Sequence, residues 1–487
     1  MAKKPRRPLQ EREIVHCLKT LQQFAQDIEG YETHPRFQVI LQAAMRLQST
    51  YERHQEKVPP QEEPEQTDEP ERLPGNAVIG LRLASRKRCY CCKQFMLERH
   101  PSYAAMCVSC GEVNRERRSQ QVDLRGRIAI VTGARIKIGY ATTLRLLRAG
   151  AHVIATTRFP KSAAETYARE ADFHTWRDRL EIHALDLRSF PAIRGFVEDI
   201  KRQHTHIDIL INNAAQTIRR PTPYYNPILH NESQPFESED AYQLLSDVCK
   251  ALYQKHTHSS RQLTENTTSQ LSSELLPLSD DITQRQYAPV LSSLPILAED
   301  FQEDPHSFPQ NELNMYGQPA DNRAYTSWEQ EIEDVEDFEL LEVHMINAMA
   351  PFLLMKHLRP LMLNSPFEKR FIVNVTSIEG QFVTSKKPTK GAKHPHTNMT
   401  KSALNMLTFS GAHADTKLGL YRVGVDPGWA SIENGMITRE KWIELGVEAP
   451  LDFDDAATRI TDPIYQSLLF DVSIHGKLFK DFQVVPW

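Results

Sequence analysis

The chain has 487 residues, which is more than one ordinary domain needs and predicts two or three folded units. Its 40% of hydrophobic and 25% of charged residues are typical of a globular protein with a sizeable core. The net charge of −5 argues against a generally basic nucleic-acid binder, and no apolar run approaches membrane-spanning length. The basic start lacks the apolar core of a secretory signal, so we expect a cytoplasmic protein, with a nuclear location as the alternative.

The first 58 residues carry two helical patterns. Apolar residues recur at helical spacing from Ile14 to Ile28 and again from Phe37 to Leu47, and "GYETHP" separates the two runs. These patterns predict a helical hairpin over residues 1–58, which would suit the docking of a protein partner. Residues 59–85 are rich in proline and glutamate and predict a polar linker.

Two Cys-x-x-Cys pairs stand close together after the linker. They are formed by Cys89, Cys92, Cys107 and Cys110. Zinc prefers four soft ligands in a tetrahedron, so the paired spacing predicts a zinc-ribbon-like or treble-clef-like module over residues 86–114. The alternative is a set of reduced structural cysteines. We expect Cys91 and His100 to be neighbours of the metal rather than ligands.

Basic residues flank the cysteines at 86–88 and at 115–118. A zinc module with basic edges can hold phosphate groups, which would suit nucleic acid. Neither interleaved aromatic residues nor a base-reading helix supports that use, so we expect a solvated rim instead. Because the sheet predicted below has its own core, we expect dinucleotide binding to survive loss of the module.

Short β-branched runs alternate with helical patterns from residue 122 to the end. The runs are RIAIVTGA, AHVIATTR, LEIHALDL, IDILINNAA, RFIVNVTS and YRVGVDPG. This alternation predicts an α/β protein with a Rossmann-type, doubly wound parallel sheet over residues 122–487. An insertion over about 217–322 interrupts it, rich in Ser, Pro, Asn, Gln and acids. We expect a lid, an interaction segment or a disordered loop that buries little apolar surface.

The first predicted strand ends in a turn that opens a helix, where backbone amides can receive a pyrophosphate. From this point the chain resembles the short-chain dehydrogenase/reductase family, whose turn reads Thr-Gly-x-x-x-Gly-x-Gly. Gly133 and Gly139 match its first and last glycines, while Lys137 stands at the middle one. The chain further resembles a branch that pairs a CY-x-C knuckle with RxKIGY and HPHTNM-x-K motifs.

Other family motifs follow in order: LDL, NNAA, the helix asparagine, VNVTS and VDPGW. The resemblance implies that LDL contacts adenine, that NNAA lies beside the cofactor, and that the Pro-Gly segment follows the nicotinamide. The implied cofactor-binding residues are Thr132, Gly133, Arg135, Lys137, Ile138, Gly139, Thr157, Arg158, Asp186, Leu187, Asn213, Ala214, Lys401, Pro427 and Gly428.

The charge at the end of the second predicted strand favours NADP over NAD. An acid there binds ribose hydroxyls and selects NAD, whereas a neutral residue followed by arginine admits the extra phosphate. Here Thr157 precedes Arg158, and Arg135 and Lys137 add positive charge nearby. The alternative is that Arg158 merely faces solvent.

The resemblance implies a catalytic set of Asn347, Ser377, Thr397 and Lys401, with one departure. The family places a tyrosine four residues before the lysine, and here Thr397 occupies that position. We therefore expect an NADP-dependent oxidoreductase of atypical activity on an unidentified carbonyl or alcohol. The alternative is a weakly catalytic NADP-binding scaffold or sensor acting through protein, and less so nucleic-acid, contacts. A homo-oligomer is also expected.

Overall fold

The structure, a computed structural model, describes residues 80–254, 288–382 apart from 292, 293, 303, 310, 312 and 315, and 391–487. The chain divides into two units, Met1–Leu73 and Pro74–Trp487, and everything described belongs to the second. The predicted hairpin and most of the predicted linker lie outside the described residues, so these expectations stay predictions.

A mostly parallel sheet confirms the predicted fold class. Its strands are β3 (Ile128–Thr132), β4 (His152–Thr157), β5 (Leu180–Ala184), β6 (Ile209–Asn212), β7 (Arg370–Val375), β8 (Leu420–Asp426), β9 (Leu478–Lys480) and β10 (Gln483–Val485). Their order is β10-β9-β8-β7-β6-β3-β4-β5, and β10 alone among these pairs antiparallel. All six predicted runs form strands. The order reverses between β3 and β6, where open α/β sheets bind ligands.

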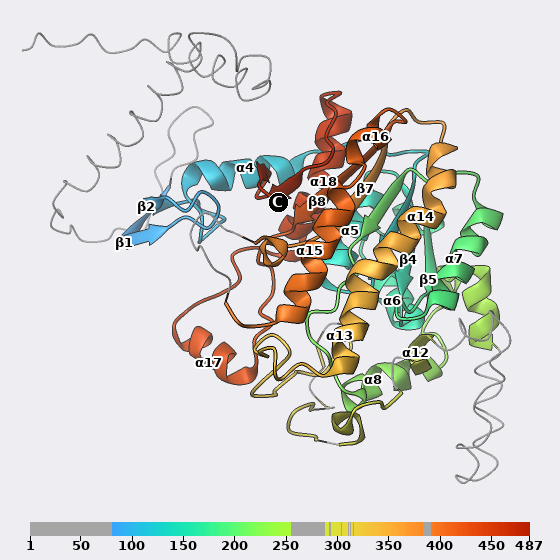
Figure 1. Cartoon of the computed structure of the whole chain (residues 1–487), viewed down its shortest axis with the longest axis horizontal. Helices are drawn as coiled ribbons and strands as arrows, with labels where there is room; N and C mark the ends of the chain where they lie inside the picture. The colour runs from blue at the N-terminus through green and yellow to red at the C-terminus, as the bar shows by residue number, and fades with distance from the viewer. Residues whose placement is uncertain are drawn as a thin grey trace, which may run out of the picture. The chain divides into compact units, whose positions relative to one another are not determined.

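Helices cover both faces of the sheet (Figure 1). On one face lie α5 (Lys137–Arg148), α6 (Pro160–Ala168) and α18 (Phe453–Leu469), and on the other lie α7 (Phe190–Gln203), α14 (Ala350–Leu363) and α15 (Pro395–Phe409). Successive side chains of a strand point to opposite faces of the sheet. In β3, Ala129 and Val131 therefore pack in one core cluster and Ile130 packs in the other. Further helices are α13 (Asp337–His344), α16 (Ala412–Thr416) and α17 (Met436–Glu444), with short turns at Phe173–Thr175, Arg177–Arg179, Ala298–Phe301 and Ile378–Gly380.

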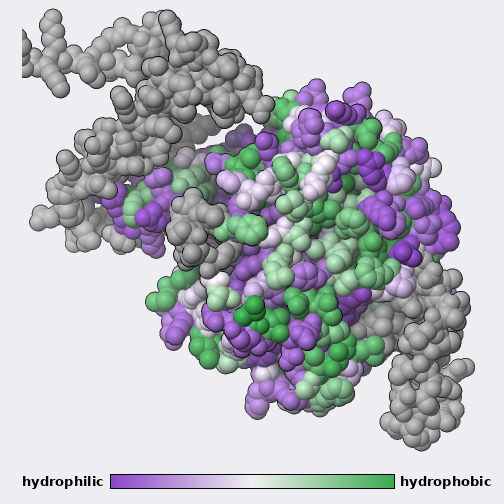
Figure 2. Space-filling model, viewed as in Figure 1, coloured by the Kyte–Doolittle hydropathy of each residue, from purple (hydrophilic) through white to green (hydrophobic). Residues whose placement is uncertain are grey.

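The helical run Asp337–Leu363 joins α13 and α14 through a π turn at Met345–Met349. By length and composition it is the one helix in the described ranges that would suffice to cross a membrane. Leu354, Leu358 and Met362 are buried in the core, however, so its packing is that of a core helix. Apolar side chains such as Leu341 and Phe352 remain exposed on the same run, and Figure 2 shows apolar surface on this side of the molecule.

The cysteine module is a hairpin of β1 (Leu81–Arg88) and β2 (Phe95–Arg99) followed by α4 (Val108–Ser119). The predicted bounds of 86–114 are therefore too narrow, and the predicted linker ends before Leu81 rather than at residue 85. A two-stranded hairpin buries little on either face, so β1 has the polar composition of a linker.

The module packs against the end of the eight-stranded sheet, chiefly on α18. The Tyr103 hydroxyl donates to Asp455 at 2.9 Å, and the Arg459 guanidinium donates to the Asn114 side chain at 2.7 Å. Met106 joins the same apolar cluster as Leu451. The module therefore shares a core with the sheet instead of standing apart from it.

Much of the described insertion is folded, which makes the expectation of little apolar burial wrong for these residues. It contains α8 (Thr222–Ser233), α9 (Glu239–Gln243) and α12 (Ala288–Leu291). Tyr224, Tyr225 and Ile228 are buried with Phe308 in a cluster of their own. Phe308 is distant in the sequence from Tyr224 and Tyr225 and joins them only in the folded chain, so composition alone understates the burial.

A buried ion pair joins two distant parts of the insertion, its start and the segment near residue 300. Arg219 binds Asp300 and Glu299, each at 2.5 Å, and the two carboxylate side chains are 1% and 44% exposed. Breaking a buried pair leaves an uncompensated charge, whereas an exposed pair contributes little.

We expect Asp300→Asn to lower the free energy of unfolding by about 3–5 kcal/mol, and the matched variant Glu299→Gln by about 1 kcal/mol or less. Urea unfolding followed by circular dichroism measures both. Equal losses in the two variants would show that the buried Arg219–Asp300 pair stabilises the folded insertion no more than the exposed Arg219–Glu299 pair does.

Candidate cofactor pocket and cysteine cluster

A cavity of about 780 Å³ lies at the carboxyl edge of the central strands, where the strand order reverses. The predicted site residues that line it are Gly133, Arg135, Lys137, Ile138, Gly139, Thr157, Arg158, Asp186, Leu187, Asn213, Ala214, Ser377, Thr397, Lys401, Pro427 and Gly428. Thr132 and Asn347 are buried directly behind its wall. The fold thus brings every predicted cofactor and catalytic residue to one place.

The turn between β3 and α5 approaches β6 so closely that two positions require glycine. A Cβ on Gly133, whose φ is +66°, would lie 2.9 Å from the Ala214 Cα, and one on Gly139 would lie 2.1 Å from the Gly133 carbonyl oxygen. Lys137 also has a positive φ, +52°. This conformation costs a non-glycine residue about 1 kcal/mol or more, which accounts for the family's glycine there. The Lys137 ammonium lies 3.4 Å from the Glu433 carboxylate.

Thr132 and Asn213 join the ends of β3 and β6. The Thr132 hydroxyl oxygen accepts the backbone N–H groups of Asn213 and Ala214, both at 3.0 Å. The Asn213 side chain in turn donates to the Thr132 carbonyl at 3.0 Å. These residues therefore hold the pocket floor in shape.

Three arginines gather at the end of β4. Arg158 donates to the Tyr225 hydroxyl at 3.2 Å, and Arg220 lies over the Tyr224 ring. Arg135 is buried beneath them and donates to the Tyr316 carbonyl at 3.0 Å.

Burial by itself raises the pKa of Tyr225, but Arg158 and Arg220 outweigh it and leave that pKa below its ordinary value. This end of the pocket is therefore electropositive and suits an anionic group. Sequence reasoning missed Arg220 and Tyr225, because both belong to the insertion.

Asp186 forms the neighbouring wall with its charge already compensated. Its carboxylate accepts from the Arg188 guanidinium at 2.7 Å and from the Arg188 backbone N–H at 2.9 Å. Arg188 also binds Glu342 at 2.6 Å. The predicted adenine-side acid is thus held rigidly and does not offset the three arginines.

Lys401 and Thr397 lie one turn apart on α15 at the other end of the pocket. The Lys401 ammonium donates to the Val375 carbonyl at 2.9 Å, and burial lowers its pKa to about 8 against the raising effect of Asp426. Thr397 is buried, and its hydroxyl oxygen has no hydrogen-bond partner among the described residues. The Ser377 hydroxyl accepts the Glu379 N–H at 3.1 Å. Both residues line the cavity, and the Thr397 hydroxyl is buried in its wall.

Asn347 lies in the π turn of the long helix, a distortion that is frequent at functional sites. Its side-chain oxygen accepts the Gln216 N–H at 2.7 Å, and its amide donates to the Gln216 carbonyl and to the Thr400 hydroxyl. It therefore ties this helix both to the segment after β6 and to α15.

The nearby histidines do not replace the missing phenol. His394 caps α15 and stacks on Trp328 with ring centroids 4.1 Å apart. His396 is buried 3.7 Å from Glu339, and burial lowers its pKa to about 4. Neither lines the cavity with Thr397 and Lys401.

Two cavity-lining residues come from the cysteine module. The Tyr90 hydroxyl accepts the Trp429 N–H at 2.8 Å, and the Lys93 ammonium lies 4.4 Å from the Tyr90 ring centroid. Tyr90 thereby holds the segment that follows Pro427 and Gly428. Sequence reasoning missed this contact, since Tyr90 precedes Trp429 by 339 residues.

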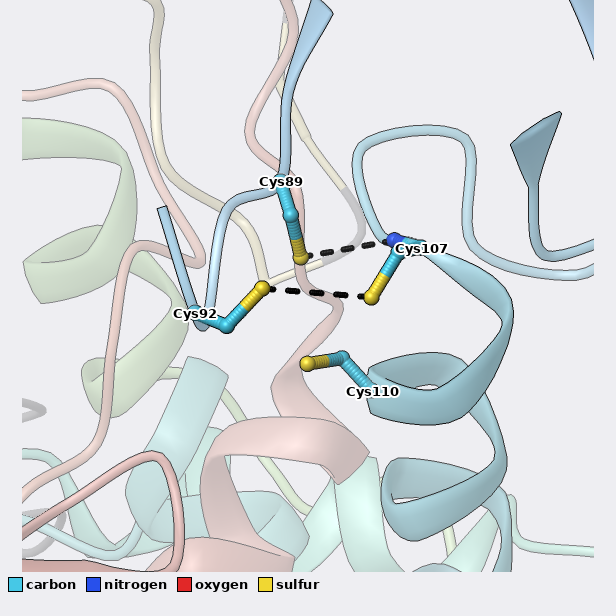
Figure 3. Close-up of side chains that lie close together, drawn as sticks. All are labelled: Cys89, Cys92, Cys107 and Cys110. Carbon is cyan, nitrogen blue, oxygen red and sulfur yellow. Dashed lines mark hydrogen bonds between the residues drawn. The ribbon is translucent and has the colours of Figure 1, made fainter. Parts of the chain in front are cut away.

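The four predicted cysteines point toward one another (Figure 3). Their sulfur atoms all lie within 4.8 Å, and those of Cys92 and Cys107 are 3.9 Å apart. Four sulfurs at the usual zinc distance would be about 3.8 Å apart, so the cluster fits zinc. Cys89 and Cys92 come from the β1–β2 turn, while Cys107 caps α4 and Cys110 lies in its first turn. Of the two predicted types of module, the treble-clef-like one has this arrangement.

The two spare candidates are not members of the cluster and have other partners. The Cys91 sulfur lies 3.7 Å from the Met106 sulfur, and His100 binds Glu112 at 2.8 Å. At this cluster the four predicted cysteines are therefore the residues that could hold a metal ion.

Known proteins resemble this chain over part or most of its length. The family pattern described as short chain dehydrogenase matches residues 127–230. Uncharacterized protein R665 of Acanthamoeba polyphaga mimivirus is 30% identical over 403 residues, which are 80% of this chain and 73% of the viral protein. The chain belongs to the short-chain dehydrogenase/reductase family.

Other relatives match over shorter stretches. The WW domain-containing oxidoreductase of Drosophila melanogaster is 42% identical over 93 residues, 19% of this chain and 23% of the fly protein. Retinol dehydrogenase 13 of Mus musculus is 37% identical over 90 residues, 18% of this chain and 27% of the mouse protein. The structure of NADPH-bound carbonyl reductase from chicken fatty liver covers 75% of this chain and 100% of its own, at 17% identity and a TM-score of 0.42.

Proposed function

We propose that the protein is an NADP(H)-binding oxidoreductase that moves a hydride between the nicotinamide and a carbonyl or alcohol substrate. The observation that carries this proposal is the polarity of the pocket. One end holds Arg158 and Arg220, and the other holds Lys401 with two hydroxyl side chains. A dinucleotide with an extra phosphate at one end and a reactive ring at the other has the matching polarity.

Each part of the pocket has a role in this proposal. The glycine turn and the amino end of α5 hold the pyrophosphate, because unpaired backbone N–H groups and the helix dipole favour an anion. The Arg158 fork binds the ribose phosphate, which a compact ammonium would bind less specifically. Lys401 holds the ribose beside the nicotinamide, and the cofactor supplies the hydride. Ser377 orients the substrate oxygen.

In this proposal, Thr397 limits the rate of proton transfer. A phenol gives up its proton to a forming alkoxide far more readily than an aliphatic hydroxyl does, and the threonine side chain is much shorter. We therefore propose slow reduction of ordinary ketones and aldehydes. The second candidate, an NADP-responsive scaffold, is favoured by this missing phenol together with the cysteine module that contacts the same pocket.

We also propose that the four cysteines hold a zinc ion and that this ion supports the pocket. A closed four-thiolate site would fix the β1–β2 turn, and Tyr90 in that turn contacts Trp429. Loss of the metal would therefore disturb the cofactor site. This proposal replaces the expectation from the sequence that dinucleotide binding survives loss of the module. The expected homo-oligomer, through the exposed side chains of the α13–α14 run, stays a proposal that light scattering would test.

We expect NADPH to bind at least about tenfold more tightly than NADH, because one charge-assisted arginine–phosphate contact contributes about 1.5–3 kcal/mol. Arg158→Ala should remove most of this preference. The matched control is Arg169→Ala, at an exposed arginine paired with Glu237, which should keep it. Calorimetry with both cofactors measures the ratio of the NADPH and NADH affinities. Equal affinities in the unmodified protein would contradict the assignment of NADP as the cofactor.

We expect Thr397→Tyr to raise the rate of carbonyl reduction by about two orders of magnitude or more, since that is the usual contribution of a positioned general acid. NADPH oxidation with a panel of aldehydes and ketones measures it, with cofactor affinity measured in parallel. Brisk turnover by the unmodified protein that persists in Thr397→Val would show that another group donates the proton.

We expect Cys107→Ser to lose one zinc ion per chain and to weaken NADPH binding, because the turn that carries Tyr90 loses its support. Tyr90→Phe should weaken NADPH binding while keeping the zinc. Cys91→Ser, at a cysteine beside the cluster that is not one of its four members, should change neither property. Metal analysis measures the zinc content, and NADPH fluorescence titration measures the affinity for NADPH. Unchanged affinity in Cys107→Ser would show that the module does not support the pocket.

A further inference from the structure

A cluster of three histidines and a glutamate lies at the opposite edge of the sheet from the cofactor pocket. His152 begins β4, Glu181 and His183 lie in β5, and His204 ends α7. The amino ends of neighbouring parallel strands meet at one edge, and α7 returns the chain to that edge before β6. None of these residues takes part in the proposed reaction.

The spacing within the cluster is too long for good hydrogen bonds. The Glu181 Oε2 atom lies 3.4 Å from His204 Nε2 and 3.8 Å from His152 Nε2. Both of these nitrogens are buried and have no hydrogen-bond partner among the described residues. Buried polar atoms are normally satisfied, so two adjacent exceptions that face one carboxylate oxygen need an explanation.

The same spacing suits a shared metal ion. Ligands about 2.0–2.1 Å from a tetrahedral zinc ion lie about 3.4 Å from one another. One ligand atom from each of His152, Glu181 and His204 can be chosen so that all three lie within 4.8 Å of one another. Two imidazoles and one carboxylate are a frequent zinc ligand set, with a fourth position left for water.

His183 completes the arrangement by holding the other carboxylate oxygen. Its Nε2 atom lies 2.7 Å from Glu181 Oε1, so Oε2 is directed toward the other two histidines. Such an outer hydrogen bond orients a metal ligand. The side chains of His152, Glu181 and His204 are 33%, 19% and 13% exposed, which leaves an entry path for an ion.

We propose that His152, Glu181 and His204 bind a divalent transition metal ion, zinc in the first instance, at a second metal site distinct from the cysteine cluster. The ion links the start of β4, the start of β5 and the end of α7. His183 is a positioning residue for Glu181. The ligand chemistry separates the two sites, since one offers thiolates and the other nitrogen and oxygen.

Cobalt titration of the chelator-stripped full chain tests this proposal. We expect two equivalents to bind, one with thiolate-to-cobalt charge-transfer bands and one with ligand-field bands alone. Glu181→Gln and His204→Asn should each bind only the equivalent with thiolate bands. His183→Asn should keep the second site with about tenfold or more weaker affinity, as expected for loss of an orienting contact. The control His174→Asn, at an exposed histidine outside the cluster, should bind both.

X-ray absorption at the zinc edge of the unmodified protein provides a readout that needs no variant. Nitrogen and oxygen ligands in addition to sulfur support the second site. A single bound equivalent with sulfur ligands only, or full retention of the second equivalent in Glu181→Gln, would overturn the proposal. The cluster would then be a set of histidine–carboxylate ion pairs.

Discussion

The close approach of the β3–α5 turn to the end of β6 is the constraint on which the pocket depends. Gly133 and Gly139 leave no room for a side chain, and Thr132 holds the facing backbone through two hydrogen bonds. The pocket floor is consequently made of backbone, which can contact a pyrophosphate directly. Lys137 bears the conformational cost of this turn and places a cation at its rim.

The cysteine module forms part of the pocket wall through Tyr90 and Lys93. Arg459 is almost fully buried in α18, where it binds Asn114 of the module and Asp481 near the chain end. Buried charged networks contribute little net stability but can fix one orientation of the packed elements. Tyr90 then accepts the Trp429 N–H in the cavity wall. The module and the cavity are therefore joined by direct contacts.

Features with a short-range signal could be predicted from the sequence. Buried parallel strands read as β-branched runs, and the cysteine pairs and the Lys401 helix keep their motifs within a few residues. Features that arise from distant contacts could not. The polar strand at Leu81 resembles a linker, β9 and β10 have only three residues each, and Arg220 and Tyr225 reach the pocket from an insertion. The His152 and Glu181 cluster exists only because parallel strands begin at one edge.

The pocket separates the physical requirements of binding from those of proton transfer. In the proposed function, binding would draw on the glycine turn, the arginines and Lys401, which are spread along the whole cavity. Proton transfer depends on one group at one point, and there Thr397 replaces a phenol. Lys401, whose pKa burial lowers to about 8, has Thr397 one turn away and not the phenol that such a lysine would activate. In the function proposed above, the oxidoreductase and the scaffold would therefore differ at this point by one side chain.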